Sequence, residues 1–203
     1  MPQTFPALNL GGTADGLLVL SNGRFFRGKL RGAPVEATGK VILNTSMTGY
    51  QEILTDPSYA GQIVTMTYPH IGNYGINPDD MESKTIHASA LVVRELSQLS
   101  SNWRATQTLE EWLIEKRIPV LEGVDTRSLV KAIRSEGECS GLLVPSDSSH
   151  TLDVLREEAM GLPSMVGQNL ARQVSARESY FWASEEDIES LLVIAYDFGI
   201  KYN

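Results

Sequence analysis

The residues best suited to chemistry lie between Asn44 and Gly75. From Asn44 to Tyr59 the chain reads Asn-Thr-Ser-Met-Thr-Gly-Tyr-Gln-Glu-Ile-Leu-Thr-Asp-Pro-Ser-Tyr, and residues 68–73 read Tyr-Pro-His-Ile-Gly-Asn. A hydrophobic core needs few such hydroxyl, amide and turn-forming residues, whereas a loop that offers hydrogen bonds to a ligand or to a neighbouring domain needs many. The ordinary alternative is a set of turns and helix caps, and the residue types alone leave both interpretations open.

The only cysteine, Cys139, lies in a misleading motif. Gly137-Glu138-Cys139-Ser140-Gly141 fits Gly-x-Cys-x-Gly, the pattern of a nucleophile elbow. Such an elbow requires a strand before the nucleophile and a helix after it. Here an amphipathic helix is predicted before Cys139 and an apolar strand after it. We therefore interpret Cys139 as incidental and expect no catalytic residue in this chain.

Metal and nucleotide motifs are absent from the sequence. The three histidines, His70, His87 and His150, are far apart and have no metal-ligand spacing. We expect a structural or interface role for His70 and ordinary roles for the other two. The sequence contains no Gly-x-Gly-x-x-Gly or Walker pattern. We therefore predict no metal site and no cofactor in this chain.

The composition and charge of the chain disfavour several kinds of partner and location. The 203 residues carry a formal net charge of −8, which disfavours nucleic acid and anionic membranes as partners because both select for clusters of Lys and Arg. No apolar run approaches the length of a membrane span. The first residues lack the basic and apolar regions of a secretory signal, and a single cysteine allows no internal disulfide. We expect a cytoplasmic location.

Strands dominate the predictions for the first half of the chain. Leu17–Leu20 and Arg24–Gly28 flank Asn22-Gly23, which predicts a hairpin with a tight turn. The runs 40–43, 62–68 and 90–94 are apolar or rich in β-branched residues and predict further strands, the second ending before Pro69.

Helices are predicted in the second half. Thr108-Leu109-Glu110-Glu111 fits a capping box, and Asp125 suits the N-cap of a helix that ends at Gly137. Residues 141–145 predict a strand, and residues 151–159 predict a third helix. The stretch 161–184 is weakly periodic and predicts an irregular connection.

The run Leu191–Gly199 differs from everything before it. A continuous apolar stretch that ends in Asp and Gly is typical of a central parallel strand in an α/β domain. A lone parallel strand cannot bury both of its faces, so we expect the first strand of a truncated doubly wound domain. The alternative is a terminal strand added to the sheet of the first domain.

Four segments together resemble one known family. They are residues 44–59, residues 68–73, Asp125-Thr126-Arg127 and residues 195–201, which reads Ala-Tyr-Asp-Phe-Gly-Ile-Lys. In order and spacing they are similar to the small, glutamine-hydrolysing subunit of carbamoyl phosphate synthetase, from about Leu17 to the end of the chain.

The resemblance implies a function. In that family a class I glutamine amidotransferase domain, with a Cys-His-Glu triad, releases ammonia from L-glutamine for a large subunit that uses ATP and Mg. One residue of the N-terminal domain reaches the glutamine, the Ser of Asp-Pro-Ser-Tyr, which is Ser58 here. The expected partners of this chain are the large subunit and, in the full-length subunit, L-glutamine.

The resemblance also implies a domain plan. Residues 1–16 would be an N-terminal extension, 17–160 a β-rich α/β domain of the swivelling β/β/α type with flanking helices, 161–190 a linker and 191–203 the first strand of the truncated amidotransferase domain. The expected role is docking to the large subunit and completing the glutamine pocket. The alternative is a freestanding, non-catalytic docking module.

Overall fold

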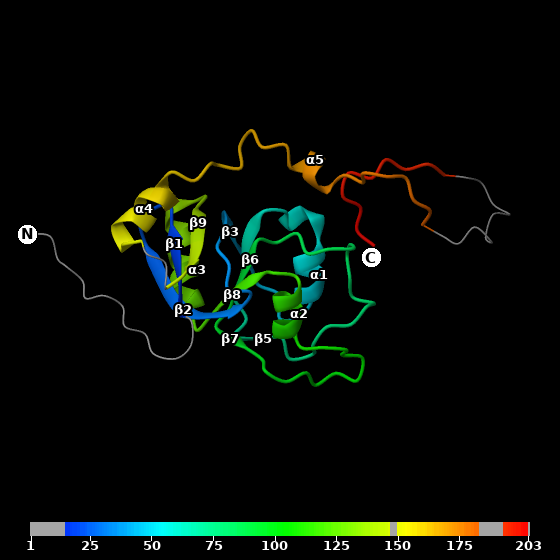
Figure 1. The fold of residues 1–203 in the computed structure, drawn as a ribbon, viewed down its shortest axis with the longest axis horizontal. Helices are drawn as coiled ribbons and strands as arrows, with labels where there is room; N and C mark the ends of the chain where they lie inside the picture. The colour runs from blue at the N-terminus through cyan, green and yellow to red at the C-terminus, as the bar shows by residue number, and fades with distance from the viewer. Residues whose placement is uncertain (1–14, 147–149, 183–192, 203) are drawn as a thin grey trace, which may run out of the picture.

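Seven strands form a closed, β-rich sheet at the centre of the chain (Figure 1). The computed structural model describes residues 15–146, 150–182 and 193–202. The strand order is β1-β2-β8-β6-β4-β3-β9, and β9 pairs with β1 to close the sheet. The strands are β1 Asp15–Leu20, β2 Phe25–Gly32, β3 Ala37–Asn44, β4 Gln62–Met66, β6 Ala90–Val92, β8 Pro119–Glu122 and β9 Ser140–Pro145. The predicted mixed α/β class with a β-rich core is confirmed at this level.

The predicted hairpin is present. β1 and β2 pair antiparallel, and Gly23 sits between them at a φ of 81°, a left-handed value that glycine adopts without a steric penalty. The Leu20 amide donates to the carbonyl of Arg24 at 2.8 Å. β1 begins at Asp15, two residues before the predicted start of the domain.

A parallel half of the sheet is buried on both faces. β3, β4, β6 and β8 pair parallel in that order. In β6, Ala90 and Val92 point into one hydrophobic cluster and Leu91 into another. Strands buried on both faces need continuous apolar runs, which is why 62–68 and 90–94 were recognisable in the sequence.

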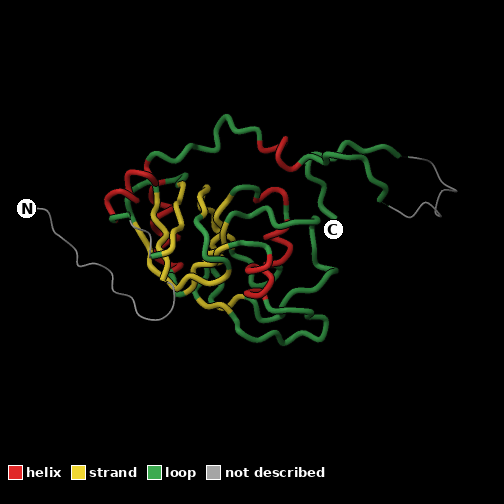
Figure 2. The backbone as a smooth tube through the Cα atoms, viewed as in Figure 1, coloured by secondary structure: helices red, strands yellow, loops and turns green. Residues whose placement is uncertain are grey.

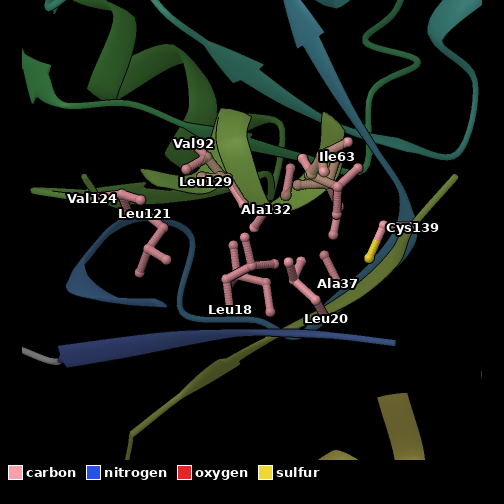
Figure 3. Packing of buried hydrophobic residues seen from close by; sticks show 14 of the residues in the cluster. Leu18, Leu20, Ala37, Ile63, Val92, Leu121, Val124, Leu129, Ala132 and Cys139 are labelled. Carbon is pink, nitrogen blue, oxygen red and sulfur yellow. The ribbon is translucent and has the colours of Figure 1, made fainter. Parts of the chain in front are cut away.

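Three of the five described helices contribute to the hydrophobic clusters on the two faces of this parallel half. The helices are α1 Tyr50–Thr55, α2 Leu109–Glu115, α3 Thr126–Glu136, α4 Leu152–Met160 and α5 Leu170–Val174, and a short 3₁₀ turn, η1, spans Pro57–Tyr59. α1 and α2 belong to the cluster around Leu91. α3 contributes Leu129 and Ala132 to the other cluster, where Figure 3 shows them facing Leu18 and Leu20 of β1.

Three predicted helices are confirmed by their caps. The Thr108 and Glu111 side chains form the complete capping box at the start of α2. Asp125 caps α3 by accepting from the Ser128 amide, and Thr151 caps α4. The structure also contains elements that the sequence patterns did not predict, namely α1, β8, α5 and the parallel pair of two-residue strands β5 (His70–Ile71) and β7 (Glu95–Leu96).

The strand predicted at 191–199 is wrong where the structure describes it. Leu191 and Leu192 lie outside the described residues, and 193–199 form no regular element, so they appear as loop in Figure 2. Val193 is 83% exposed and Ile194 is 80% exposed. No described strand pairs with this stretch, so its backbone groups have no ladder to join, whether in a second domain or at the edge of the first.

Candidate functional site

Ser58 lies in a sharp bend between α1 and β4. Gly49, at a φ of 78°, turns the chain into α1, and α1 ends at Thr55 with Asp56 as its C-cap. Pro57 then opens η1, since its fixed φ suits the first position of a helical turn. Asp56 and Pro57 are buried, whereas Ser58 is exposed. The structure therefore presents this serine at the surface on a bend whose flanking residues are packed.

Asp56 fixes the backbone of this bend. One carboxylate oxygen accepts from the Ser58 amide at 2.8 Å, and the other lies 2.8 Å from Lys201 Nζ. Burial opposes ionisation of Asp56, but the hydrogen bonds from Lys201 and Ser58 outweigh it, so the pKa of Asp56 is lowered. Asp56 is therefore a carboxylate at neutral pH. It holds residues 56–59, which we call the serine turn, against residues 197–202, which we call the C-terminal segment.

Backbone contacts add to this docking of the C-terminal segment. The Tyr202 amide donates to the carbonyl of Glu82 at 2.9 Å, and a β-carbon placed on Gly199 would lie 3.0 Å from Pro57 Cβ. Asp197 is tied further back in the chain, because Tyr180 donates to its carboxylate at 2.7 Å. Residues 197–202 thus lie against the serine turn, although 193–196 are exposed.

Many of the polar residues between Asn44 and Gly75 tie loops to one another. The Tyr50 hydroxyl donates to the carbonyl of Gly75 at 2.7 Å, and the Gly49 amide donates to the Tyr74 hydroxyl at 2.9 Å. The rings of Tyr50 and Tyr74 stack at 4.2 Å. Burial raises the pKa of both phenols, that of Tyr74 to about 12, so both stay neutral. Here the turns-and-caps interpretation holds.

Gln51 makes a similar link between α1 and a loop. Its amide nitrogen donates to the carbonyl of Asn77 at 2.5 Å, and its amide oxygen accepts from the Asn77 backbone at 3.0 Å. Because Gln51 is fully buried, this paired hydrogen bond replaces the water that its amide loses. α1 is thereby fixed to the loop that follows β5, and the bend at Ser58 has a rigid support.

A serine–histidine contact near Pro57 does not form a nucleophile. Ser83 Oγ lies 3.0 Å from His87 Nε2, but it also lies 2.6 Å from the carbonyl of Thr55, which can only accept. A hydroxyl has one proton, so Ser83 donates to Thr55 and the histidine has none to remove. Burial lowers the pKa of His87, against the opposing effect of Asp56. The pair braces the end of α1.

The remaining candidates are placed as follows. His70 is partly exposed and lies 3.4 Å from Glu95 on the neighbouring strand β7. Cys139 is 2% exposed, between α3 and β9, at the edge of the hydrophobic cluster in Figure 3. Its sulfur lies 3.4 Å from Ser21 Oγ. The predicted order of helix, cysteine and strand is thus confirmed, and the thiol is closed off from solvent.

A cavity of about 350 Å³ borders the serine turn without reaching Ser58. It lies between Pro57, Ser83 and His87 on one side and residues from the stretches 174–180 and 197–202 on the other. Ser58 does not line it, so the structure brings the serine and its Asp56 support together without placing the hydroxyl in this cavity. No group of three or more His, Cys, Asp or Glu among the described residues could hold a metal ion.

The described part of the chain contains no helix long and apolar enough to cross a membrane.

Comparison with known proteins gives a consistent result. Residues 18–143 match the family described as "Carbamoyl-phosphate synthase small chain, CPSase domain". The carbamoyl phosphate synthase small chain of Syntrophotalea carbinolica is 48% identical over 200 residues, covering 92% of this chain and 52% of that protein. The small chain of Escherichia coli (strain K12) is 44% identical with the same coverage.

A plant protein is similar to the same extent. The chloroplastic small chain of Oryza sativa subsp. japonica is 46% identical over 94% of this chain and 44% of its own length. The chain thus spans about half the length of the curated relatives it matches. A solved aminopeptidase from Aneurinibacillus sp. strain AM-1 aligns over 66% of this chain, but its TM-score of 0.34 carries no argument about the fold.

Proposed function

Because this chain belongs to the carbamoyl-phosphate synthase small-chain family, we propose that it serves a glutamine-dependent carbamoyl phosphate synthase, as the part that docks to the large chain and completes the glutamine pocket. The whole small chain would hydrolyse glutamine and pass ammonia to the large chain, which would use ATP and Mg. The product would enter arginine and pyrimidine biosynthesis, in the cytoplasm.

The observation that carries this proposal is the support under Ser58. A hydroxyl can accept from the ammonium of a glutamine or donate to its carboxylate, so it suits the task chemically. Its backbone is held by Asp56 at 2.8 Å, and Asp56 is held in turn by Lys201. An exposed serine on a fixed bend is arranged to meet a ligand from outside the fold, because little conformational entropy remains to be lost on binding.

We also propose the domain plan expected from the sequence. Residues 17–160 would form the docking domain, of the swivelling β/β/α type, 161–190 a linker, and 191–203 the start of the amidotransferase domain. The helices on both faces of the parallel strands support the first assignment. The contacts of residues 197–202 with the serine turn support a second domain adjacent to Ser58.

The catalytic Cys-His-Glu residues would lie outside these 203 residues, so we expect no glutaminase activity from this chain alone. The measurement is ammonia release from glutamine by the purified chain. Turnover that disappears in Cys139→Ser would contradict the proposal, because it would make the buried thiol a nucleophile.

The decisive experiment is Ser58→Ala in a full-length small chain assembled with its large chain. A neutral hydrogen bond contributes about 0.5–1.5 kcal/mol, and more when the ligand group is charged. We expect KM for glutamine to rise roughly three- to tenfold, by the usual conversion of free energy to affinity. If the contact is equal in the ground and transition states, kcat holds.

Two controls make the result specific. Synthesis from ammonia bypasses the glutamine pocket and should be unchanged in Ser58→Ala. Ser135→Ala, at an exposed serine of α3, should leave both reactions unchanged. An unchanged KM for glutamine with a lowered melting temperature would reduce Ser58 to a turn residue and leave this chain with a docking role only.

A further inference from the structure

A second cavity, larger than the one beside Pro57, lies on the outer face of the sheet, away from Ser58. α4 covers part of this face, packing Leu155 and Ala159 against Val19, Leu142 and Val144. Beyond α4 the same strands border a cavity of about 590 Å³, which we call the β2 cavity. Small-molecule sites typically measure about 300–1,000 Å³, so this one is large enough for an organic ligand.

The β2 cavity has an apolar side. β9 and β1 are neighbours in the sheet, and Leu17 of β1 lies opposite Val144 of β9 in the register. Both side chains line the cavity together with Leu152 and Leu155 of α4. These residues offer an apolar wall at the end of the cavity nearest the helix.

The other side of the cavity is basic. Successive residues of a strand point to opposite faces, so β2 places Arg27, Lys29 and Arg31 on one face. Arg94, from the connection between β6 and β7, also lines the cavity. Four cationic side chains therefore meet in one cavity of a chain whose net charge is −8. His150 is a further lining residue.

The acidic residues of the cavity compensate only part of this charge. Glu122 lies 3.1 Å from Arg31, and its other oxygen accepts from the Leu96 amide at 3.0 Å, so both oxygens are engaged. Arg31 also approaches Glu110 at 3.8 Å. Asp15 lies opposite Lys29 in the register of β1 and β2 but does not come within ion-pair distance.

Three of these cations thus form no close ion pair. Arg94 does interact with a carboxylate at longer range, because the pKa of Asp125 is lowered chiefly by the hydrogen bond from Ser128 and in part by the charge of Arg94. Within the described ranges, Arg27, Lys29 and Arg94 have no carboxylate oxygen within 4.0 Å, and Arg27 packs over the Phe25 ring at 5.6 Å. Like charges held around a concavity repel one another and raise the local concentration of anions. Arginine and lysine are also the usual donors to phosphate and carboxylate groups.

We propose that the β2 cavity binds a small organic anion, whose phosphate or carboxylate group faces Arg27, Lys29 and Arg94 and whose apolar body packs against Leu17 and Val144. The proposal does not rest on the role of Ser58, since the two sites share no residue. It assigns a ligand to a face of the fold away from Ser58.

The test uses simple probes with the whole 203-residue chain. Phenyl phosphate and benzoate carry the two candidate anionic groups on the same apolar ring, and benzyl alcohol is their uncharged counterpart. We expect at least one anion to bind in calorimetry, and benzyl alcohol to bind about tenfold more weakly or not at all, because charge-assisted hydrogen bonds are lost. Inorganic phosphate alone should bind more weakly than phenyl phosphate, because it has no apolar body to pack against Leu17 and Val144.

Variants locate the binding. Lys29→Gln and Arg94→Gln should each weaken the bound anion by about tenfold. Arg134→Gln, at an exposed position of α3 outside the cavity, is the matched control and should change nothing. Gln98→Trp places an indole at the exposed rim of the cavity without changing charge, and should also block binding. Melting curves with and without ligand check that each variant is folded.

Three results would overturn the proposal. The first is that neither anion binds the unaltered chain. The second is binding that Lys29→Gln, Arg94→Gln and Gln98→Trp all leave unchanged, since the anion would then lie elsewhere. The third is equal binding of benzyl alcohol, which would make the cavity an apolar groove with no selection for charge.

Discussion

Two stretches of nearly the same sequence differ in structure in this protein, one being a buried strand and the other, where it is described, an exposed irregular segment. Leu-Leu-Val-Leu at 17–20 forms β1, in which Leu18, Val19 and Leu20 are fully buried. Leu-Leu-Val-Ile at 191–194 is described only from Val193, and there both side chains are more than three-quarters exposed. The two runs have the same propensity for strand, so propensity did not decide between them.

What differs is the availability of neighbours. β1 pairs with β2 on one edge and with β9 on the other, and α3 and α4 contact its two faces. Residues 193–196 pair with no described strand, and the chain is next held at Asp197. An apolar run becomes a strand only when another strand completes its hydrogen bonds and another layer covers its face.

Hydrogen exchange should give the largest contrast between the two runs. Amides of Leu18 and Leu20 should exchange about a thousandfold or more slowly than that of Ile194, because β1 opens only with the barrel. The measurement is exchange followed by mass spectrometry or NMR on a dilute monomer. Strong protection of residues 193–196 would mean that this run belongs to the first sheet after all.

Truncating a side chain should lower the free energy of unfolding much more in the first run than in the second. Leu18→Ala should lower the free energy of unfolding by about 2–5 kcal/mol, since it leaves a cavity inside the closed sheet. Val193→Ala should change it by less than about 0.5 kcal/mol. Urea denaturation measures both. A loss above about 1 kcal/mol in Val193→Ala would show that the C-terminal run is packed in solution.

Substitution of a glycine inside the barrel extends the comparison, because it adds an atom to the core instead of removing one. A β-carbon on Gly141 of β9 would lie 2.6 Å from Val41 Cγ2 and 3.0 Å from Leu18 Cδ1. Gly141→Ala should therefore cost about 1–3 kcal/mol, as overpacking of a full core does. Gly161→Ala is the control, because its β-carbon would come no closer than 3.4 Å to any neighbour. Equal stabilities would mean that the barrel can expand around residue 141.

The smallest expected effect concerns the one ion pair that ties the C-terminal segment to the serine turn. Lys201→Met should cost about 0.2–1 kcal/mol at neutral pH, since the lysine side chain is 49% exposed and exposed pairs contribute little. The pKa of Asp56 is lowered in the fold, so its contribution is present above the ordinary Asp pKa of about 3.9 and is lost as pH falls through the lower folded value.

Lys201→Met should lose part of this dependence of stability on pH. The difference in stability between the parent chain and Lys201→Met should begin to shrink as pH falls below about 4, and it should disappear once pH passes the lowered pKa of Asp56 in the folded parent, because Asp56 is then protonated in both. Lys201→Arg, which keeps the charge, serves as the control. A difference that stays constant down to the acid limit would show that Asp56 does not bind this lysine in solution.

The sequence predicted those elements that carry their own local signals. The Asn22-Gly23 turn, the capping box at Thr108 and the Asp125 cap each satisfy backbone groups with adjacent side chains, and all three are present. α1 and β8 were missed for the converse reason. Gly49 provides no side-chain cap for α1, and β8 is a strand of four residues whose stability comes from β2 and β6.

Local sequence signals reached less of the candidate site, and the role of Ser58 stays a prediction. The family resemblance singled out Ser58, but nothing near it in the sequence pointed to Lys201, which reaches Asp56 from 145 positions away along the chain. The cations of the β2 cavity were equally hidden, since Arg94 joins Arg27 and Lys29 only after β8 has paired with β2. Contacts of this kind depend on topology, which local patterns do not encode.

Because Cys139 is buried, the rate at which its thiol reacts can report how often the barrel opens. The chain has one thiol, it is 2% exposed, and it lies where α3 passes into β9, the strand that closes the barrel onto β1. A thiol reagent can modify it only when this seam opens, so the labelling rate reports the frequency of that opening. Each variant of the 203-residue chain that keeps Cys139 can be followed in this way, because it has no other thiol to react.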